Sequence, residues 1–323
     1  MNTPIIIFNF KEYWRNPFVN KFIDGEKYEG IMVFENDKKV IWFSHPFNFE
    51  QVKKEYGKKI IIKELNKDSL KMLKKRKIIG YDSRYTTVSQ LKSIKKILKK
   101  NKIIDISKDI EKKREIKTKE EIKKISIAVK NTKKIILKSK KKLKKGVSEK
   151  QIEEFVKKEF KKNKMIHAFI IIAFGKNTKN LHHVSTKTKL MDGPVLFDIG
   201  GKYKGYCSDI SESFWFGKKE KKYFEYEKEL VLIKKCLKKI EKKLREGIKA
   251  KELFTEVKKL KLPHSLGHGI GLEEHDYPIG IGNKSNWKLK KGMVLAIEPG
   301  KYNKFGIRIE KNYLIKKDGF KEL

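Results

Sequence analysis

Cysteine is nearly absent from this chain. Its 323 residues include only two cysteines, Cys207 and Cys236, and no CxxC motif. One pair cannot form a disulfide framework for a chain of this length, and a cysteine-rich zinc site is excluded. Such sparing use of cysteine fits a reducing compartment, so we expect a cytoplasmic protein.

Long apolar runs are missing as well. No stretch approaches the roughly 20 apolar residues that are needed to cross a bilayer. The short apolar run at residues 5–8 lacks the basic residues and the small-residue cleavage site of a secretory signal. We therefore predict a β-strand at this position and a soluble protein without membrane contact.

Arginine is the third scarce residue. It supplies only six of the 81 Lys and Arg residues, although the net charge is +41. The forked guanidinium of arginine is the group best suited to paired contacts with phosphates and bases. The lysines are spread over the whole chain without a polybasic tail. We interpret the charge as a solvated lysine-rich surface, with polyanion binding as the alternative, and expect nucleic acid to bind only through non-specific electrostatics.

The length of the chain predicts two domains. Residues 1–108 alternate short β-rich runs with helical stretches, a pattern typical of an α/β layer structure. The expected strands are Ile5–Phe8, Gly30–Phe34, Val40–Phe43, Ile60–Ile62 and Ile78–Tyr81, and the expected helices are Asn48–Tyr56, Asp68–Lys77 and Ser89–Lys99. Residues 105–119 are charged and poor in large apolar side chains, so we expect them to link this domain to a second one, residues 109–323.

The second domain begins with apolar residues at helical spacing from Ile122 to Ile136. Ser148 and Gln151 predict a capping box at the start of the next helix, and a third helix is expected over residues 220–245. The expected strands are Phe169–Gly175, Val195–Gly200, Gly205–Ile210, Met293–Gly300 and Gly306–Ile315. This pattern predicts an α+β domain with an antiparallel sheet and flanking helices.

Two of the expected hairpins carry pairs of carboxylates. A turn around residues 203–204 would set Asp198 opposite Asp209, and a turn around Lys304 would set Glu298 opposite Glu310. Facing cross-strand residues have Cβ atoms about 4.5–5.5 Å apart. Carboxylates that close repel each other unless a cation lies between them. Each acid alone is a common turn or surface residue, but two facing pairs on apolar strands predict a metal site.

A histidine-rich and glycine-rich segment supplies candidate imidazole ligands. It contains His264, His268 and His275, and the glycines around His268 favour a strand or loop over a helix. Four carboxylates and one imidazole suit two divalent cations about 3.5–4 Å apart. Ligation dominated by oxygen favours manganese, with cobalt or zinc as alternatives.

These segments resemble the pita-bread metallopeptidases, which include methionine aminopeptidase, aminopeptidase P, prolidase and creatinase. The matching pieces follow in the family's order: Asp198-Ile-Gly, Gly205-Tyr-Cys-Ser-Asp209-Ile, Gly267-His268-Gly-Ile-Gly-Leu, Ala296-Ile-Glu298-Pro-Gly and Arg308-Ile-Glu310. Residues 1–108 resemble the N-terminal domain of the creatinase and prolidase branch, which the common methionine aminopeptidases lack. The resemblance implies a creatinase-type N-terminal domain, a pita-bread catalytic domain and hydrolysis of the bond before a proline.

The resemblance also implies roles for single residues. Asp198 would hold one metal, His268 and Glu298 the other, and Asp209 and Glu310 both. Glu298 would shuttle a proton to the leaving proline nitrogen.

Further roles fall to residues around the metals. His275 and either His182 or His183 would hydrogen-bond the reacting group. His264 would line the proline pocket, and Arg308 would orient Glu310 or the substrate carboxylate.

One departure from the family concerns the residues after Asp209. The family continues with a Thr-Arg-Thr-like stretch, whereas this chain has Ser211, Glu212 and Ser213. The exchange leaves the metal ligands intact and bears on substrate preference.

Several alternatives stay open at this stage. The substrate is a small peptide with proline second, either a dipeptide or a longer peptide, and the enzyme is expected to be a homodimer. Two other readings are a methionine aminopeptidase-like activity and a catalytically inactive relative that binds RNA or ribosomes.

Overall fold

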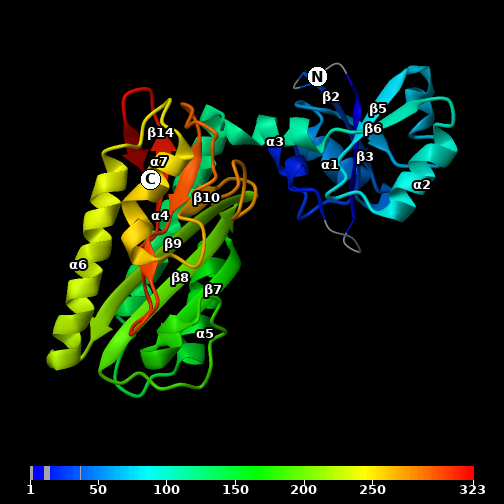
Figure 1. Ribbon diagram of the computed structural model, residues 1–323. Helices are drawn as coiled ribbons and strands as arrows, with labels where there is room; N and C mark the ends of the chain where they lie inside the picture. Colours follow the sequence, from blue (N-terminus) through cyan, green and yellow to red (C-terminus); the bar gives the residue numbers. More distant parts are fainter. Residues whose placement is uncertain (1–2, 11–14, 37) are drawn as a thin grey trace. The chain divides into compact units, whose positions relative to one another are not determined.

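The computed structural model describes residues 3–10, 15–36 and 38–323. The chain divides into two compact units, residues 1–113 and 114–323, and Figure 1 labels their main helices and strands. No helix in the described ranges combines the length and the hydropathy that crossing a bilayer requires.

The first unit is built on one six-stranded mixed sheet with the strand order β4-β3-β2-β1-β5-β6. Its strands are β1 (Ile5–Asn9), β2 (Gly30–Asn36), β3 (Lys39–Ser44), β4 (Ile61–Glu64), β5 (Ile78–Tyr81) and β6 (Lys102–Asp105). Successive residues of a strand point to opposite faces, and here both faces are buried: Ile5 and Ile7 enter one core and Ile6 the other. The prediction of an α/β layer structure is confirmed.

Helices cover both faces of this sheet. They are α1 (Phe49–Tyr56), α2 (Val88–Ile97) and α3 (Ser107–Glu115), together with 3₁₀ turns that include η3 (Lys71–Lys75). The expected helix at 68–77 was wrong, because only the 3₁₀ turn η3 forms there. The expected linker at 105–119 contains the boundary between the two units; most of it is the helix α3, whose Ile110 packs into the core with the preceding Ile106.

The second unit contains a three-stranded antiparallel sheet and a four-stranded one. The first has the order β7 (Ile166–Phe174), β8 (Gly193–Tyr203), β9 (Tyr206–Phe216), and the second the order β10 (Gly267–Gly269), β11 (Val294–Ile297), β14 (Lys311–Ile315), β15 (Phe320–Glu322). A short pair, β12 (Gly300–Lys301) and β13 (Ile307–Arg308), lies between β11 and β14 in the chain. The expected antiparallel architecture is therefore present.

Four helices bury the apolar residues of these sheets. They are α4 (Lys119–Lys140), α5 (Glu149–Lys162), α6 (Lys221–Glu241) and α7 (Ala250–Phe254). Helices α4 and α5 share one core with β7, β8 and β9, while α6 and α7 share another with β11 and β14. The capping box predicted at Ser148 and Gln151 begins α5, with both reciprocal hydrogen bonds formed. The two packed sheets are thereby held as a rigid frame for the side chains that project between them.

Candidate metal centre and active site

The β8–β9 hairpin carries the two aspartates, but with a register that differs from the prediction. Asp198 faces Ser211, and Asp209 faces Gly200. The turn lies at Lys204 and Gly205, which both have positive φ angles of 48° and 78°, as a tight two-residue hairpin turn requires. The pairing is therefore shifted by two residues, and the two aspartates are diagonal neighbours on the same face of the sheet.

The second pair of acids follows the predicted register. Gly300 pairs with Arg308 and Lys301 with Ile307, so the turn centres on Lys304. Continuing this register by two residues sets Glu298 opposite Glu310. Glu310 also joins the two hairpins, because its backbone N–H donates to the carbonyl oxygen of Ser211 at 3.0 Å.

His268 lies on the three-residue strand β10, paired with Ala296 of β11. The prediction of a strand rather than a helix at this histidine is confirmed. A Cβ atom at Gly267 would lie 2.1 Å from the carbonyl oxygen of Ala296, and one at Gly269 would lie 2.4 Å from Tyr277. The two glycines therefore let the backbone run close enough to its neighbours to point the imidazole at the acids.

The five predicted ligands converge on one point. The Nε2 atom of His268 lies 3.8 Å from Asp209 Oδ2, 3.8 Å from Glu298 Oε1 and 3.9 Å from Glu310 Oε1. Ligand atoms of Asp198, Asp209 and Glu310 lie within 4.8 Å of one another, and so do those of His268, Glu298 and Glu310. Four carboxylates and an imidazole thus surround a space of the size that divalent cations occupy.

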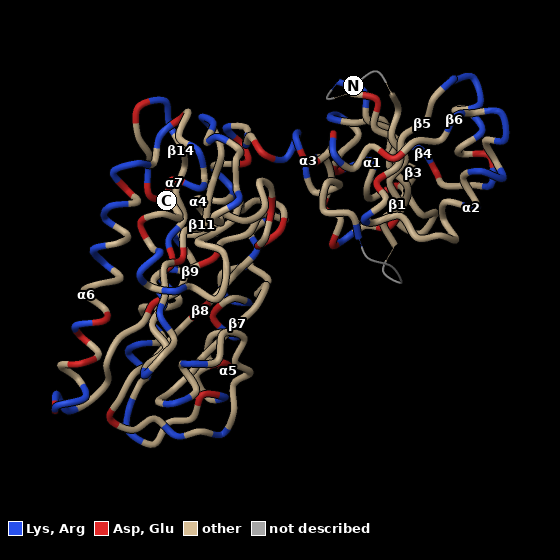
Figure 2. Tube along the Cα trace, viewed as in Figure 1, with Lys and Arg blue, Asp and Glu red and all other residues tan. Residues whose placement is uncertain are grey.

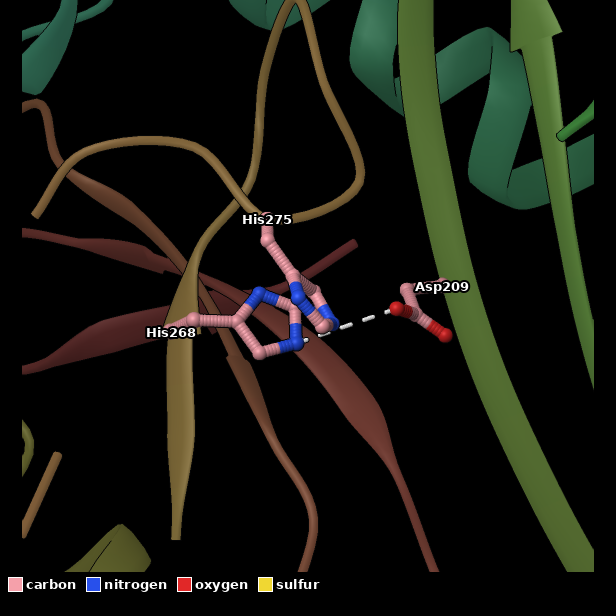
Figure 3. Close-up of side chains that lie close together, drawn as sticks. All are labelled: Asp209, His268 and His275. Carbon is pink, nitrogen blue, oxygen red and sulfur yellow. Dashed lines mark ion pairs between the residues drawn. The ribbon is translucent and has the colours of Figure 1, made fainter. Parts of the chain in front are cut away.

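His275 is a further group at this centre. The centroids of the His275 and His268 rings lie 4.1 Å apart. One ring nitrogen of His275, one of His268 and a carboxylate oxygen of Asp209 all lie within 4.8 Å of one another, close enough to hold one metal ion. Figure 3 shows the two imidazoles side by side, with Asp209 across from them. His275 is exposed, so it can reach a molecule that enters from solvent.

The electrostatics of this cluster favour a bound cation. Burial, together with the charge of neighbouring carboxylates, raises the pKa of Asp209 well above its usual range, that of Glu298 to about 9 and that of Glu310 to about 7. Burial also lowers the pKa of His268 to about 4. Within the described residues, the buried oxygens Asp209 Oδ1 and Glu310 Oε1 have no hydrogen-bond partner. Acceptors that lack donors and a neutral imidazole are the groups that divalent metals bind, so this donor set fits a metal.

Asp198 is fixed by a buried hydrogen-bond network. Its Oδ1 atom accepts from the hydroxyl of Ser211 at 2.9 Å, and its Oδ2 atom pairs with the Arg308 guanidinium. The Ser211 oxygen also lies 2.9 Å from Glu310 Oε2 and accepts from Arg308 Nε. Burial opposes the charge of Arg308, but Asp198 and nearby acids outweigh it and raise the pKa of the guanidinium. The structure thus places Arg308 on Asp198, whereas the resemblance implied Glu310 or the substrate carboxylate.

The departure at Glu212 lies away from this network. Its side chain pairs with Lys140 of α4, and in β9 it alternates with Ser211 and Ser213. Because neighbouring residues of a strand point to opposite faces, the anion that replaces the family's cation does not reach the metal centre. The hydroxyls of Ser211 and Ser213 lie on the opposite face of β9, where Ser211 contacts Asp198 and Glu310 and Ser213 donates to the carbonyl oxygen of Arg308.

Tyr302 links Arg308 to His264. The tyrosine hydroxyl lies 3.3 Å from Arg308 Nη1 and 3.0 Å from His264 Nε2, and burial raises its pKa. His264 also bonds the carbonyl oxygen of Ser265 through Nδ1 at 2.7 Å, and burial lowers the pKa of this imidazole. Sequence reasoning missed Tyr302. Its only signal was its place inside the turn between Glu298 and Arg308.

The structure separates the roles of the two adjacent histidines. His183 is buried, and its Nε2 atom lies 2.9 Å from Glu149 Oε2. His182 is exposed, lines the cavity over the acids and contributes to the electrostatic environment of His264. Both histidines border the cavity, but His183 already contacts Glu149 through Nε2, so His182 is the better candidate for contact with a substrate.

Glu149 is the second residue that sequence reasoning missed. Its carboxylate is fully buried at the start of α5. Burial by itself would raise the pKa of Glu149, but hydrogen bonds from His183 and its neighbours outweigh burial and lower this pKa. It accepts from the backbone N–H of Phe174 at 2.8 Å and from that of Thr186 at 2.9 Å. These bonds hold both ends of the loop that carries His182. No sequence pattern indicated this role, because a glutamate in the first turn of a helix is common.

The candidate metal ligands form one wall of a cavity of about 640 Å³. The rest of the lining combines apolar side chains with imidazoles and a few charges. It includes Phe169, Ile171, Leu181, Ile279, His182, His264, His275, Lys202, Glu273 and Glu274. All five predicted metal ligands and all the predicted substrate-facing residues border this one cavity.

The chain matches two known protein families, one in each of its two units. Residues 123–317 match metallopeptidase family M24, and residues 22–116 match the creatinase/prolidase N-terminal domain. An uncharacterized peptidase of Methanocaldococcus jannaschii is 44% identical over 166 residues, which cover 47% of this chain and 46% of that protein. The chain spans about half the length of the curated relatives it matches.

Solved structures are similar over nearly the whole chain. An X-Pro aminopeptidase from Thermotoga maritima has a TM-score of 0.88 at 24% identity and covers 99% of this chain and 94% of its own. A prolidase from Pyrococcus furiosus has a TM-score of 0.82 at 26% identity, with 99% and 95% covered. The fold is thus a creatinase-type N-terminal domain followed by a pita-bread catalytic domain. Since the match at residues 123–317 takes in more than half of the sequence, the chain belongs to metallopeptidase family M24.

Proposed function

We propose that this chain is a dinuclear metal-dependent peptidase that hydrolyses the bond between an N-terminal residue and a following proline. One observation carries the proposal: four carboxylates and an imidazole meet in one cavity, where the buried oxygens Asp209 Oδ1 and Glu310 Oε1 have no hydrogen-bond donor among the described residues. Membership of a metallopeptidase family agrees with it.

The placement of the ligands suggests how two ions would be held. Asp198, fixed by Arg308, would hold one ion, and His268 and Glu298 would hold the other. Asp209 and Glu310 come from different hairpins and lie between them, so they would contact both. When bound, such ions lower the pKa of a water toward neutrality and polarise the carbonyl under attack.

The residues around the metal centre would handle the proton and the substrate. Glu298 is the least buried of the predicted carboxylate ligands, and its Oε2 atom faces His264 Nδ1 at 3.7 Å. It is placed to take a proton from the attacking water and to deliver it to the proline nitrogen. His182 and His275 are exposed at the cavity and can donate hydrogen bonds to the reacting carbonyl group or to the amide that leaves.

The preference for proline is supported by the lining of the cavity. A proline ring has no N–H to satisfy and a fixed φ, so it fits a slot with apolar walls. Phe169, Ile171, Leu181 and Ile279 supply such walls next to the metal centre, and His264 borders the same space. The structural similarity to a prolidase from Pyrococcus furiosus, which covers 99% of this chain, supports this preference.

The proposal is tested by metal analysis and a substrate screen. We expect close to two divalent ions for each purified chain and cleavage of Xaa-Pro and Xaa-Pro-Yaa peptides, with little cleavage when alanine replaces proline. Glu298→Gln, which keeps the shape of the side chain, is the control for contaminating peptidases. Faster cleavage of Met-Ala-Ser than of the proline peptides would assign a methionine aminopeptidase activity instead.

Three finer expectations remain predictions. Manganese is the expected metal, because oxygen ligands dominate the site. The homodimer and the cytoplasmic location follow from the family resemblance and from the two cysteines. Sizing by light scattering and metal titration of the metal-free protein test the first two directly.

A further inference from the structure

The N-terminal unit carries a strongly basic segment that the peptidase activity does not use. From Ser83 to Ile104 the chain contains no aspartate or glutamate, although six lysines lie in this stretch. Three more lysines, at positions 74, 75 and 77, lie on or beside the turn η3, where positions 69–81 also lack acids. The net positive charge per residue in these two stretches is well above that of the chain as a whole.

Backbone contacts bring the two stretches together. The Asn101 side-chain amide donates to the carbonyl oxygen of Leu73 at 3.1 Å, and the Lys102 N–H donates to that of Lys77 at 2.9 Å. On α2 the lysines recur at positions 92, 95 and 96, a spacing that places them on one side of the helix, and Lys99 follows two residues after the end of α2. We call this surface the α2–β6 lysine patch, and its members are Lys74, Lys75, Lys77, Lys92, Lys95, Lys96, Lys99, Lys100 and Lys102. Figure 2 shows this run of basic residues along α2 and β6.

The lysines of the patch have no acidic partners among the described residues. All nine lysines are exposed, and none forms an ion pair within the ranges that the structure describes. On α4, by contrast, Lys138 and Lys140 pair with glutamates, and helix α6 carries glutamates among its lysines. Unpaired charges of one sign keep their full attraction for an anionic partner.

We propose that the α2–β6 lysine patch binds the phosphate backbone of a nucleic-acid duplex without reading its sequence. Lysines at i, i+3 and i+4 are spaced about 4.5–6 Å along a helix axis, so they can follow a linear array of phosphates. Lysine is a point charge and does not make the forked contacts that specify bases. The patch includes no aromatic side chain on which unpaired bases could stack, which favours a duplex over a single strand.

The packing of α2 argues against a membrane as the partner. A helix that lies in a lipid interface buries its apolar face among the lipids. The apolar face of α2 is already used, because Ile94, Ile97 and the following Leu98 pack into the core of the N-terminal unit. Apart from Val88 at its first position, α2 presents lysine and serine to a partner.

The experiment compares two variants that change the net charge equally. One carries Lys95→Glu, Lys96→Glu and Lys99→Glu. The other reverses three lysines with the same spacing on α6, at positions 234, 235 and 238, which are also exposed. Binding to a 20-base-pair duplex is measured by fluorescence anisotropy at several salt concentrations, with Xaa-Pro cleavage as the check that the catalytic unit is intact.

The wild-type protein should bind with an affinity that falls with salt, by a slope of about 0.9 for each phosphate neutralised. We expect the α2 variant to lose at least about tenfold in affinity and up to about 2.7 in slope, while the α6 variant stays within about threefold. Lys→Gln exchanges at the same α2 positions give the same test if the Glu variant unfolds. Equal losses of affinity in both variants would mean that the duplex responds to the net positive charge of the whole chain, and would overturn the proposal. So would unchanged binding of the α2 variant, or patch-dependent binding to phosphatidylserine vesicles without duplex binding. Peptidase activity is independent of every one of these outcomes.

Discussion

Removal of the divalent ions should make the stability of the catalytic unit depend on pH in the alkaline range. Without a cation, burial and the charge on Glu310 hold the pKa of Glu298 at about 9, whereas its ordinary value is 4.5. In this range the native state therefore binds more protons than the unfolded chain does. The free energy of unfolding then falls as the pH rises.

The useful window for this effect lies between pH 6.5 and 9. Below pH 6.5 the opposite effect enters, because the folded protein keeps His268 neutral down to a pKa of about 4 while the unfolded imidazole takes up a proton near 6.5. Within the window the rise in the pKa of Glu298 corresponds to about 3 kcal/mol, at about 1.4 kcal/mol for each pKa unit. In a unit of this size that loss lowers Tm by about 6–12 °C.

The assay is thermal unfolding of chelator-treated protein at several pH values from 6.5 to 9, repeated with manganese restored. We expect the decline in Tm only in the metal-free protein, because a bound cation keeps the carboxylates ionised at every pH in the window. Glu298→Gln is the matched control, since it removes one titrating group and keeps the side chain's shape. Its metal-free Tm should fall less with pH than that of the wild-type protein, and the remaining decline belongs to Asp209 and Glu310, whose pKa values burial also raises. A decline of the same size with manganese present, or in the Glu298→Gln protein, would refute the assignment of this cluster as a metal site.

Further outcomes follow from single substitutions at the site. Asp209→Asn should lower kcat/KM by several orders of magnitude and reduce the metal content without unfolding the protein, and near-normal turnover with metal bound would contradict its role. His182→Ala should reduce kcat at least about a hundredfold, as expected for a lost proton donor, with Tm unchanged. His183→Ala should instead lower the free energy of unfolding by about 1.5–3 kcal/mol, because the buried Glu149 carboxylate loses one hydrogen bond and keeps those from Phe174, Asn177 and Thr186. Glu149→Gln should lower kcat and leave the metal content of the purified protein unchanged, which separates a positioning role from a ligand role.

The pattern of apolar residues predicted most helices and strands of this protein, and its failures have a physical cause. The stretch at 105–119 was expected to be a linker, and no helix was predicted there because few of its side chains are large and apolar. Ile106 and Ile110 lie four residues apart and pack into the core of the N-terminal unit, and Ser107 and Arg114 of α3 are buried as well. Two buried contacts are sufficient when the helix packs on an existing core, and a count of apolar residues cannot show that such a core is near.

The candidate metal ligands were predictable because each lies on a strand or directly beside one: Asp198, Asp209 and His268 lie on β8, β9 and β10, and Glu298 and Glu310 lie next to β11 and β14. The side-chain period of a strand is two, so a slip of the pairing by two residues leaves every side chain on its own face. Asp198 and Asp209 therefore point into the same space in the observed register, although their direct partners are Ser211 and Gly200. The prediction of facing aspartates was wrong, and the prediction of a shared face was not affected.

The same slip explains why the residues that hold the ligands could not be found from the sequence. Ser211 meets Asp198 only in the observed register of β8 and β9, and it meets Glu310 only because a second hairpin packs beside the first. Tyr302 and Glu149 reach the site from segments whose distance from it depends on the whole packing. The direction of a ligand is determined by the face of its own strand, whereas the residue that holds it is determined by strand register and by contacts between distant segments.

Variants of Ser211 should for that reason alter the geometry of Asp198 and Glu310 together. Ser211→Ala removes one hydroxyl that contacts both acids. We expect weaker metal affinity with the fold intact, measured by titration of the metal-free protein. Unchanged affinity in that variant would show that Arg308 alone fixes the orientation of Asp198.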